Sequence, residues 1–316
     1  MQCERNFFGV DVAKDELVIA TEPELRQRSI RNQATPITAW LREIPAGSCI
    51  AMESTGRYHA VLARLAAQTG MKVYVLNARD VNLYAKSLGV RGKTDAKDAK
   101  VIARYLAEHH QKLHEWTPGT PAQQQVLELL RRRAQIERHL SAVAQSLDGV
   151  AGLKTQLTAL KRHAAKMLGV VDQKVQQLVQ AEPKMRDGYR RLLTIVGIGP
   201  QTAAVLTAVL SRIDFRNLDA VVAFSGLDPR PSDSGHKRGR RVLTKRGPAT
   251  LRRLLWLAAF SASHSKVFKP QFDVIKRKGL SNTESVVILA RKILRIAWAV
   301  WRTGMPFDAT KVAAAA

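Results

Sequence analysis

Hydrophobic and polar residues alternate along the first hundred residues in short runs that predict strands and helices in turn. Residues 6–13 and 16–21 are apolar runs rich in β-branched and aromatic side chains, and the polar positions between them predict a β-hairpin. A third strand is expected at residues 27–32. The later elements are expected in the order helix 35–44, strand 48–55, helix 58–70 and strand 72–78. Three strands followed by alternating helix and strand predict an α/β domain with a mixed sheet.

A different periodicity occupies residues 120–182, where apolar side chains recur at spacings of four and three. The series consists of Ile136, Leu140, Val143, Leu147 and Val150, followed by Leu157, Leu160, Ala164, Leu168, Val171, Val175 and Leu178. Gly149 and Gly152 interrupt it, so we expect two long helices, folded as a hairpin or bent, that form a coiled-coil segment. Both a helical spacer and a self-association surface are compatible with this spacing.

Two further helices are expected on either side of a tight Gly197-Ile198-Gly199 turn, and Pro200 suits the first position of the second helix. Glycine lets the backbone approach a phosphate, whose charge also suits the free N–H groups at the start of a helix. The pattern is typical of a helix-hairpin-helix, which binds the DNA backbone independently of sequence. A plain turn between two helices is the alternative.

The chain finishes with two amphipathic helical segments, residues 247–263 and 281–301. Ser281 and Glu284 have the spacing of a capping box and predict the start of the second segment. The tryptophans at helical positions are expected in the core rather than as platforms for bases: Trp256, Trp298 and Trp301.

Charge distinguishes the last part of the chain from the rest. The chain carries 51 Lys and Arg against 26 Asp and Glu, a net charge of +25, and residues 186–316 hold 24 basic and 8 acidic residues, a net +16. Such a region favours a polyanionic partner, first of all nucleic acid, with an anionic membrane or simple solubility as alternatives.

Cysteine usage and hydropathy narrow the class of protein. Cys3 and Cys49 offer no disulfide framework and no secretory leader is apparent, so a cytoplasmic protein is expected. The apolar stretch at residues 286–301 is interrupted by Arg291, Lys292 and Arg295, so it is not expected to span a bilayer.

A loop rich in Gly, Pro and Ser at residues 226–247 carries most of the candidate phosphate ligands. Its cations are Arg230, Lys237, Arg238, Arg240, Arg241, Lys245 and Arg246. Such a loop buries little apolar surface, so we expect a ligand or a neighbouring domain to order it. Ser234 precedes Gly235 and has the positive surroundings that a hydroxyl attacking phosphorus needs, although a turn serine is the simpler interpretation from the residues alone.

Four isolated carboxylates form the second candidate site. Asp11 lies within the first apolar strand, Glu53 lies at the end of a buried strand, and Asp95 and Asp98 lie three apart on one expected helix face. A charge in an apolar strand costs free energy unless it is paired or coordinates an ion, and Mg²⁺ prefers such oxygen ligands together with phosphates. The alternatives are a salt bridge or turn cap for Asp11, an N-cap or ion pair for Glu53, and a solvated helix start for the other two.

In these features the chain resembles the DEDD transposases of insertion-sequence family one-ten. The resemblance covers nearly the whole chain and is carried by "GVDVAKDEL", "AMESTGRYH", "VRGKTDAKDAKVIARYL", "LLTIVGIGPQTAAVL" and "FSGLDPRPSDSGHKRGRRVLTKRG". It implies a RuvC-like branch of the RNase H fold, whose acids would be Asp11, Glu53, Asp95 and Asp98 and would bind two Mg²⁺ ions, with Mn²⁺ as a possible substitute.

The resemblance also implies a DNA recombinase whose nucleophile is the serine at Ser234. Members of the family often have two serines before two glycines, whereas this chain has Asp233 and His236 at the outer positions, so Ser232 remains open as the nucleophile. Some members are guided by a structured non-coding RNA of their own element. These recombinases work as assemblies on donor and target double-stranded DNA, which favours a homo-oligomer, a dimer or tetramer, for this chain.

We therefore expect three parts: a RuvC-like metal-binding domain at 1–117, a coiled-coil oligomerisation segment at 118–185, and a mostly α-helical basic transposase domain with the helix-hairpin-helix and the serine at 186–316. The expected function is a Mg²⁺-dependent, RNA-guided DNA recombinase that acts through a phosphoserine intermediate. A RuvC-like nuclease that uses water and a non-catalytic nucleic-acid-binding scaffold are the alternatives.

Overall fold

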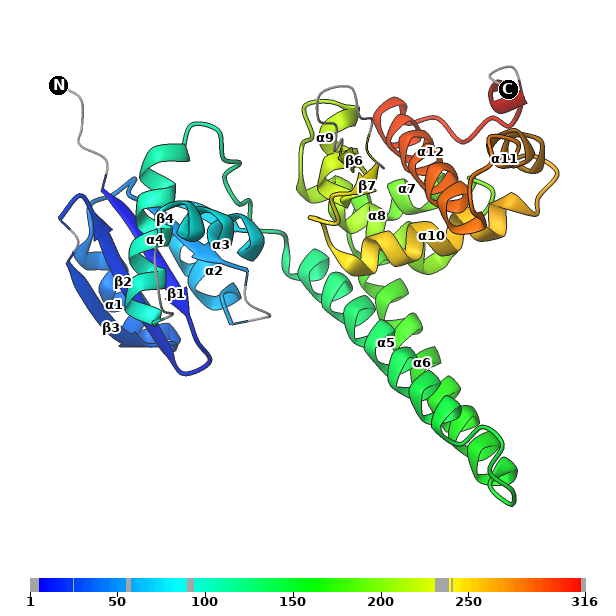
Figure 1. The fold of residues 1–316 in the computed structure, drawn as a ribbon, viewed down its shortest axis with the longest axis horizontal. Coiled ribbons are helices and arrows are strands. Elements are labelled where there is room, and N and C mark those ends of the chain that lie inside the picture. Colours follow the sequence, from blue (N-terminus) through cyan, green and yellow to red (C-terminus); the bar gives the residue numbers. More distant parts are fainter. Residues whose placement is uncertain are drawn as a thin grey trace. The chain divides into compact units, whose positions relative to one another are not determined.

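The computed structural model describes residues 6–24, 26–54, 58–89, 94–230, 239 and 241–313. The chain divides into two compact units, Met1–Pro118 and Gly119–Ala316, each with its own hydrophobic core. In Figure 1 the first unit is a sheet with helices, and the second is a group of helices that includes a long hairpin. The segment expected to form a coiled coil is thus part of the same compact unit as the basic region.

Five strands form one mixed sheet in the first unit, in the order β3-β2-β1-β4-β5. The first three pair antiparallel, and β4 and β5 continue the sheet parallel to β1. The strands are β1 (Phe7–Val12), β2 (Glu16–Glu22), β3 (Gln27–Arg31), β4 (Cys49–Glu53) and β5 (Lys72–Leu76). This topology confirms the predicted mixed sheet and agrees with an RNase H-like first unit.

Helices cover both faces of this sheet (Figure 1). They are α1 (Ala34–Glu43), α2 (Ala60–Gln68), α3 (Ala78–Ser87) and α4 (Asp95–His109). Successive side chains of β1 point to opposite faces of the sheet and so belong to two separate cores. Phe8 and Val10 pack with α1 and α2, whereas Phe7 packs with α4. The helix α3 was not predicted, although the Asn77 side chain caps it by accepting a hydrogen bond from the Arg79 N–H.

The contact between α4 and β1 is closer than any side chain permits. A Cβ placed on Gly9 would lie 2.1 Å from Ala103 N and 2.3 Å from Ala99 O, both backbone atoms. Ala20, Ala99 and Ala103 are fully buried and complete this contact of small residues. Glycine at position 9 therefore sets how near the acidic helix lies to the sheet.

The second unit consists mainly of helices. They are α5 (Pro121–Ser146), α6 (Lys154–Ala181), α7 (Pro183–Leu192), α8 (Pro200–Arg212), α9 (Leu218–Ser225), α10 (Ala249–Ser263), α11 (Lys269–Lys276), α12 (Asn282–Thr303) and α13 (Thr310–Ala313), with short strands β6 (Pro229–Arg230) and β7 (Val242–Leu243). The predicted capping box of Ser281 and Glu284 starts α12. Trp256, Trp298 and Trp301 pack against the core, as predicted. Among the described helices, none is long and apolar enough to cross a membrane.

The two long helices α5 and α6 lie side by side as a hairpin (Figure 1), which decides between the two predicted arrangements. Near its base, Val126 and Leu130 of α5 and Val175 and Val179 of α6 join the core of the second unit. The predicted apolar series does not stay buried toward the tip, since three of its members are 40–49% exposed: Val143, Val150 and Leu160.

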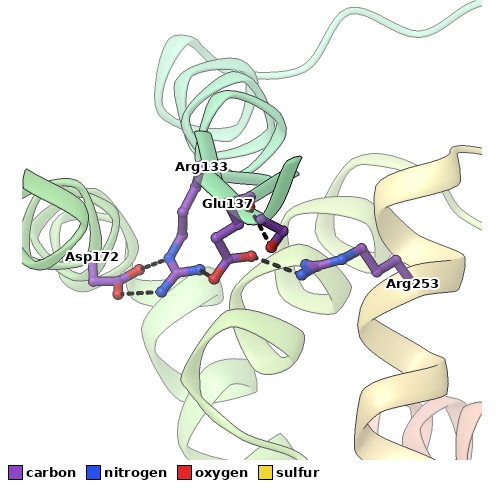
Figure 2. A network of polar contacts seen from close by, with 5 residues as sticks. Arg133, Glu137, Asp172 and Arg253 are labelled. Carbon is purple, nitrogen blue, oxygen red and sulfur yellow. Dashed lines mark hydrogen bonds and ion pairs between the residues drawn. The ribbon is translucent and has the colours of Figure 1, made fainter. Parts of the chain in front are cut away.

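A network of charged side chains fastens the hairpin to the body of the second unit (Figure 2). Arg133 of α5, only 12% exposed, donates to both carboxylate oxygens of Asp172 on α6 at 2.7 and 3.1 Å and also pairs with Glu137. Glu137 in turn accepts from Arg253 of α10 at 2.8 Å. Burial acts to lower the pKa of Arg133, but hydrogen bonds to Asp172 and Glu137 outweigh it and raise that pKa. The network thus joins three helices.

Substitution of Gly9 by Ala is expected to loosen α4 from the sheet, because the added methyl group would overlap backbone atoms that no rotamer change can move. Overpacking of this kind costs roughly 1–3 kcal/mol. Hydrogen exchange measured by mass spectrometry should show faster exchange in β1 and α4. Ser29→Ala, at an exposed position of the same sheet, is the control. Unchanged protection of α4 in Gly9→Ala would contradict the proposed packing constraint.

Replacement of Arg133 by Met is expected to destabilise the second unit by about 1–3 kcal/mol, because Glu137 and Asp172 lose their shared cation and both carboxylates are partly exposed. Arg132→Met is the matched control, since Arg132 is 46% exposed and its pair with Glu128 lies within one helix. Urea unfolding followed by helical circular dichroism provides the measurement. Equal midpoints for the two variants would show that the network contributes nothing to stability.

Candidate active site and nucleic-acid surface

Asp11 and Glu53 occupy adjoining positions on neighbouring strands. The parallel register pairs Val10 with Met52, and each acid is the next residue along its strand. Because side chains alternate along a strand, Asp11 shares the face of Gly9 and Glu53 shares the face of Ala51, which is the face that α4 covers. Both acids are half-buried. The sheet therefore presents two carboxylates side by side beneath α4.

The direction of α4 decides where its own acids lie. His110, just after the helix, contacts the Phe7 ring at a centroid distance of 4.9 Å, and Ala99 contacts Gly9. Near the start of α4, the Gln27 amide of β3 donates to Ala96 O at 2.7 Å. The helix therefore crosses the sheet obliquely: its start lies on the β3 side and its end lies over β1.

Because of this oblique course, Asp95 and Asp98 differ in exposure and in their distance from β1. Asp95 is exposed and adjoins Ala96, which is bonded to β3, two strands from β1. Asp98 is half-buried and precedes Ala99, which lies on Gly9. The Thr94 side chain caps the helix by accepting from the Lys97 N–H, and both acids lie in the first turn, where the helix dipole favours negative charge.

The chemistry of these donors suits a divalent cation of the Mg²⁺ type, because every candidate ligand is a carboxylate oxygen. Among the residues that the structure describes, however, no three His, Cys, Asp or Glu side chains are grouped closely enough to hold a metal ion. The structure thus gives Asp11 and Glu53 neighbouring positions and brings Asp98 to the same sheet face, without assembling all four predicted acids into one cluster. Asp95 lies away from the other three acids because α4 begins on the β3 side of the sheet.

A second anchor holds α4 through α3. The Tyr84 hydroxyl donates to Glu108 Oε2 at 2.6 Å, and Glu108 also accepts from Arg104 Nε at 3.0 Å. Burial, together with the hydrogen bond to Glu108, raises the pKa of Tyr84 to about 12. The same tyrosine packs edge-on against Tyr105 at a centroid distance of 5.1 Å. The phenol therefore stays protonated at neutral pH and supports the acidic helix from its far end.

The candidate nucleophile lies outside the residues that the structure describes. This applies to Ser234 and Ser232, and to the predicted cations Lys237, Arg238 and Arg240. The two ends of their loop are described, because β6 and β7 pair there, with Pro229 opposite Leu243 and Arg230 opposite Val242. The described cations at these ends are all exposed: Arg230, Arg241, Lys245 and Arg246.

Arg252 holds the two ends of this loop together, a role that was not predicted from the sequence. Its Nη1 donates to the carbonyl oxygens of Gly247 and of Ser225, the latter at 3.3 Å. Burial lowers the pKa of the Arg252 guanidinium. One sequence signal was present, since a cation near the start of a helix is disfavoured by the helix dipole unless it has a carbonyl partner nearby. Arg252 therefore positions the loop ends.

The turn that was predicted to belong to a helix-hairpin-helix joins α7 to α8, and its two glycines differ in their surroundings. Gly197 has a φ of +92°, and a Cβ there would lie 2.5 Å from Ala258 O of α10. Gly199 faces open space, with no atom within 4 Å of a Cβ placed on it. A hollow of about 510 Å³ opens beside Gly199 and Pro200. Both glycines line this hollow, but α10 occupies the space where a Cβ of Gly197 would lie, whereas the corresponding space at Gly199 is open.

Family models match both units of the chain. The DEDD transposase model of the IS110 type, described as a transposase, matches residues 8–154, and one described as the transposase IS116/IS110/IS902 family matches residues 189–273. The unmatched residues between them lie in α6 and α7.

Curated relatives are similar over almost their full length. A pilin gene-inverting protein of Moraxella bovis is 28% identical over 96% of this chain and 98% of its own, and the transposase for insertion sequence element IS1328 of Yersinia enterocolitica is 27% identical over 95% and 98%. Among solved structures, T. thermophilus RuvC in complex with a Holliday junction substrate aligns with 36% of this chain and 100% of its own, at 14% identity and a TM-score of 0.29. That structural score is too low to support the fold assignment, which rests on the strand order and the family models.

Substitution of Gly199 by Ala tests the phosphate position. Its φ of −90° suits any residue and the space around it is open, so stability should not change, whereas a phosphate approaching the start of α8 would meet the methyl group. Loss of one hydrogen bond to a charged group should weaken duplex DNA binding roughly tenfold. Fluorescence anisotropy with a labelled duplex measures the affinity.

Gly197→Ala is the contrasting variant, because its positive φ and its contact with α10 predict a loss of thermal stability instead. Undiminished duplex binding by Gly199→Ala would rule out a phosphate contact at this turn.

Proposed function

Because this chain belongs to the DEDD transposases of the IS110 family, we propose that it cuts and rejoins the DNA of a mobile element through a serine-linked intermediate with the help of bound Mg²⁺. The observation that carries the proposal is the pair of carboxylates at adjoining positions of β1 and β4, beneath a helix that starts with two more acids. An acid pair of this kind in a hydrophobic sheet costs desolvation unless an ion or another partner uses it.

In the first unit, Asp11, Glu53, Asp95 and Asp98 would hold the metal, with Mn²⁺ as a possible substitute for Mg²⁺. When bound, the metal stabilises the charge on the oxygens that enter and leave phosphorus during phosphoryl transfer. Strand pairing fixes the backbones of Asp11 and Glu53, so only their side chains would need ordering on binding. Asp98 would complete the site from the helix, whereas Asp95, which lies toward β3, would reach the metal only by a shift of the first turn of α4.

In the second unit, Ser234 would be the nucleophile. Its hydroxyl loses a proton, its Oγ forms a bond to the scissile phosphorus, and the bond to the leaving deoxyribose oxygen breaks as that oxygen takes up a proton. A hydroxyl of the partner strand then attacks the phosphoserine and releases the serine, so no external energy source is needed. Exposed cations at the loop ends, including Arg230 and Arg241, are suited to stabilise the phosphate charge.

The partners that we propose are polyanions and further copies of this chain. The net charge of +16 over residues 186–316 favours donor and target duplexes and a structured guide RNA of the same element. If a paired RNA selects the DNA, the protein needs to recognise backbone and shape more than bases. The exposed Val143, Val150 and Leu160 on the α5–α6 hairpin support self-association into a dimer or tetramer. We expect the protein to act in the cytoplasm, at the nucleoid.

A denaturing gel assay tests this proposal. Protein is incubated with Mg²⁺, DNA spanning the junction of the element, and RNA from its non-coding flank, and is then denatured. A protein band covalently linked to DNA is expected for the unaltered chain and for Ser232→Ala, and its loss is expected in Ser234→Ala. Asp11→Asn should reduce the adduct by at least roughly 100-fold, because removal of groups that stabilise transition-state charge has effects of this size.

Three other outcomes would change the assignment. Loss of the band in Ser232→Ala but not in Ser234→Ala would move the nucleophile to Ser232. Strand cleavage without a covalent band, unaffected by either serine substitution, would favour the nuclease that uses water. Nucleic-acid binding without cleavage, unaffected by Asp11→Asn, would favour the scaffold.

A further inference from the structure

Three rings are stacked in a column along one side of α10. Trp256 and Phe260 are nearly parallel, at an interplanar angle of 8° and a centroid distance of 5.3 Å. Phe260 and His264 meet edge to face at 5.0 Å. The three residues are four apart, so they lie above one another on the helix. We call Trp256, Phe260 and His264 the aromatic column.

The column begins in the core and ends in solvent. Trp256 packs against the hydrophobic core of the second unit, whereas Phe260 is 41% exposed and His264 is exposed as well. His264 Nδ1 lies 2.9 Å from Phe260 O, which is a hydrogen bond back to its own helix and leaves Nε2 directed away from that carbonyl. Core packing therefore explains Trp256 but not the exposed rings that continue the column.

A hollow of about 390 Å³ adjoins the exposed end of the column. Phe260 and His264 line it from α10, and Lys269, Phe272 and Lys276 line it from α11. Asp273 also lines it and forms an ion pair with Lys269 at 3.2 Å. Both side chains of this pair are exposed, so Lys269 would lose little free energy by leaving Asp273 and binding a phosphate instead.

The surroundings of the hollow are positively charged. From residue 264 to 278 the chain carries five Lys and Arg residues against one acid, Asp273: Lys266, Lys269, Lys276, Arg277 and Lys278. Rings that are accessible from solvent together with neighbouring cations are the combination that single-stranded nucleic acid requires, because bases stack on the rings while phosphates contact the cations. An apolar protein partner would not explain this charge.

From this geometry we propose that the aromatic column and the adjoining hollow bind unpaired bases of a DNA strand, with Lys269 and Lys276 at the phosphates. Duplex DNA buries the faces of its bases in its own stack, so only an unpaired strand offers them. The inference rests on the proposed function, because strand exchange, with or without a guide RNA, leaves DNA bases unpaired. The role of the surface would be to hold a strand while its former partner strand is paired elsewhere.

Phe260→Leu is the test, because leucine keeps an apolar side chain at an exposed position but removes the ring. We expect it to weaken binding of the full chain to a 20-nucleotide single strand by roughly 5- to 100-fold, the range for loss of one stacked base. Phe260→Tyr, which keeps the ring, should bind like the unaltered chain. Val274→Ala, a similarly exposed apolar position of α11 that does not line the hollow, should also leave single-strand binding unchanged.

An oligonucleotide of the same length that lacks bases separates stacking from charge, since it keeps every phosphate. The unaltered chain should bind it about as weakly as Phe260→Leu binds the normal strand. Equal binding of the normal and base-free strands by the unaltered chain would overturn the proposal. Tighter binding of an RNA strand than of the DNA strand, lost in Phe260→Leu, would overturn the assignment to DNA.

Binding to duplex DNA, compared with binding to single strands, separates failure of this proposal from failure of the proposed function. If duplex binding and the serine-linked band persist while Phe260→Leu has no effect on single strands, only the column proposal fails. If Phe260→Leu instead changes the sedimentation coefficient of the free protein with no effect on single strands, the column is a protein contact. Failure of the unaltered chain to bind any nucleic acid would remove the proposed function itself.

Discussion

The first unit depends on one close contact between backbones, where α4 lies against β1 at Gly9. Without a Cβ at this position the helix approaches the sheet closely, and the small side chains of Ala99 and Ala103 complete the fit. The contact lies two residues before Asp11 on β1 and one residue after Asp98 on α4. A constraint on packing thus also determines how near acids from a strand and from a helix can come to each other.

The two units differ in net charge. The carboxylates suited to a cation lie in the first unit, which is close to electrically balanced, whereas the second unit holds most of the excess positive charge. Cations do stand near acids in the first unit, since Lys97 and Lys100 share α4 with Asp95 and Asp98. The excess of cations belongs to the second unit, where basic residues far outnumber the acids that could pair with them.

Much of the fold was predictable, because strand alternation and the order of elements depend on local sequence. Each predicted strand of the sheet is present, and so is the α5–α6 hairpin. The contacts of Arg133 were not predictable, since its partner Asp172 is 39 residues away and Arg253 lies 116 residues from Glu137. The spacing of α5 did not show where the core ends, since the apolar series continues to Val143, which is 40% exposed in the single chain. Asp11 and Glu53 stood out by their positions in apolar strands, and Asp95 and Asp98 by their spacing on one helix, but that spacing did not encode the oblique course of α4.

The charged network at the base of the hairpin has a mechanical consequence. Arg133 and Glu137 belong to one arm of the hairpin, Asp172 belongs to the other, and Arg253 belongs to α10, the helix that carries Trp256, Phe260 and His264 (Figure 2). The base of the hairpin is therefore connected to α10 through charged side chains of both of its arms. Because these pairs join the hairpin to α10, the orientation of the hairpin and that of the helix that bears the rings are fixed together.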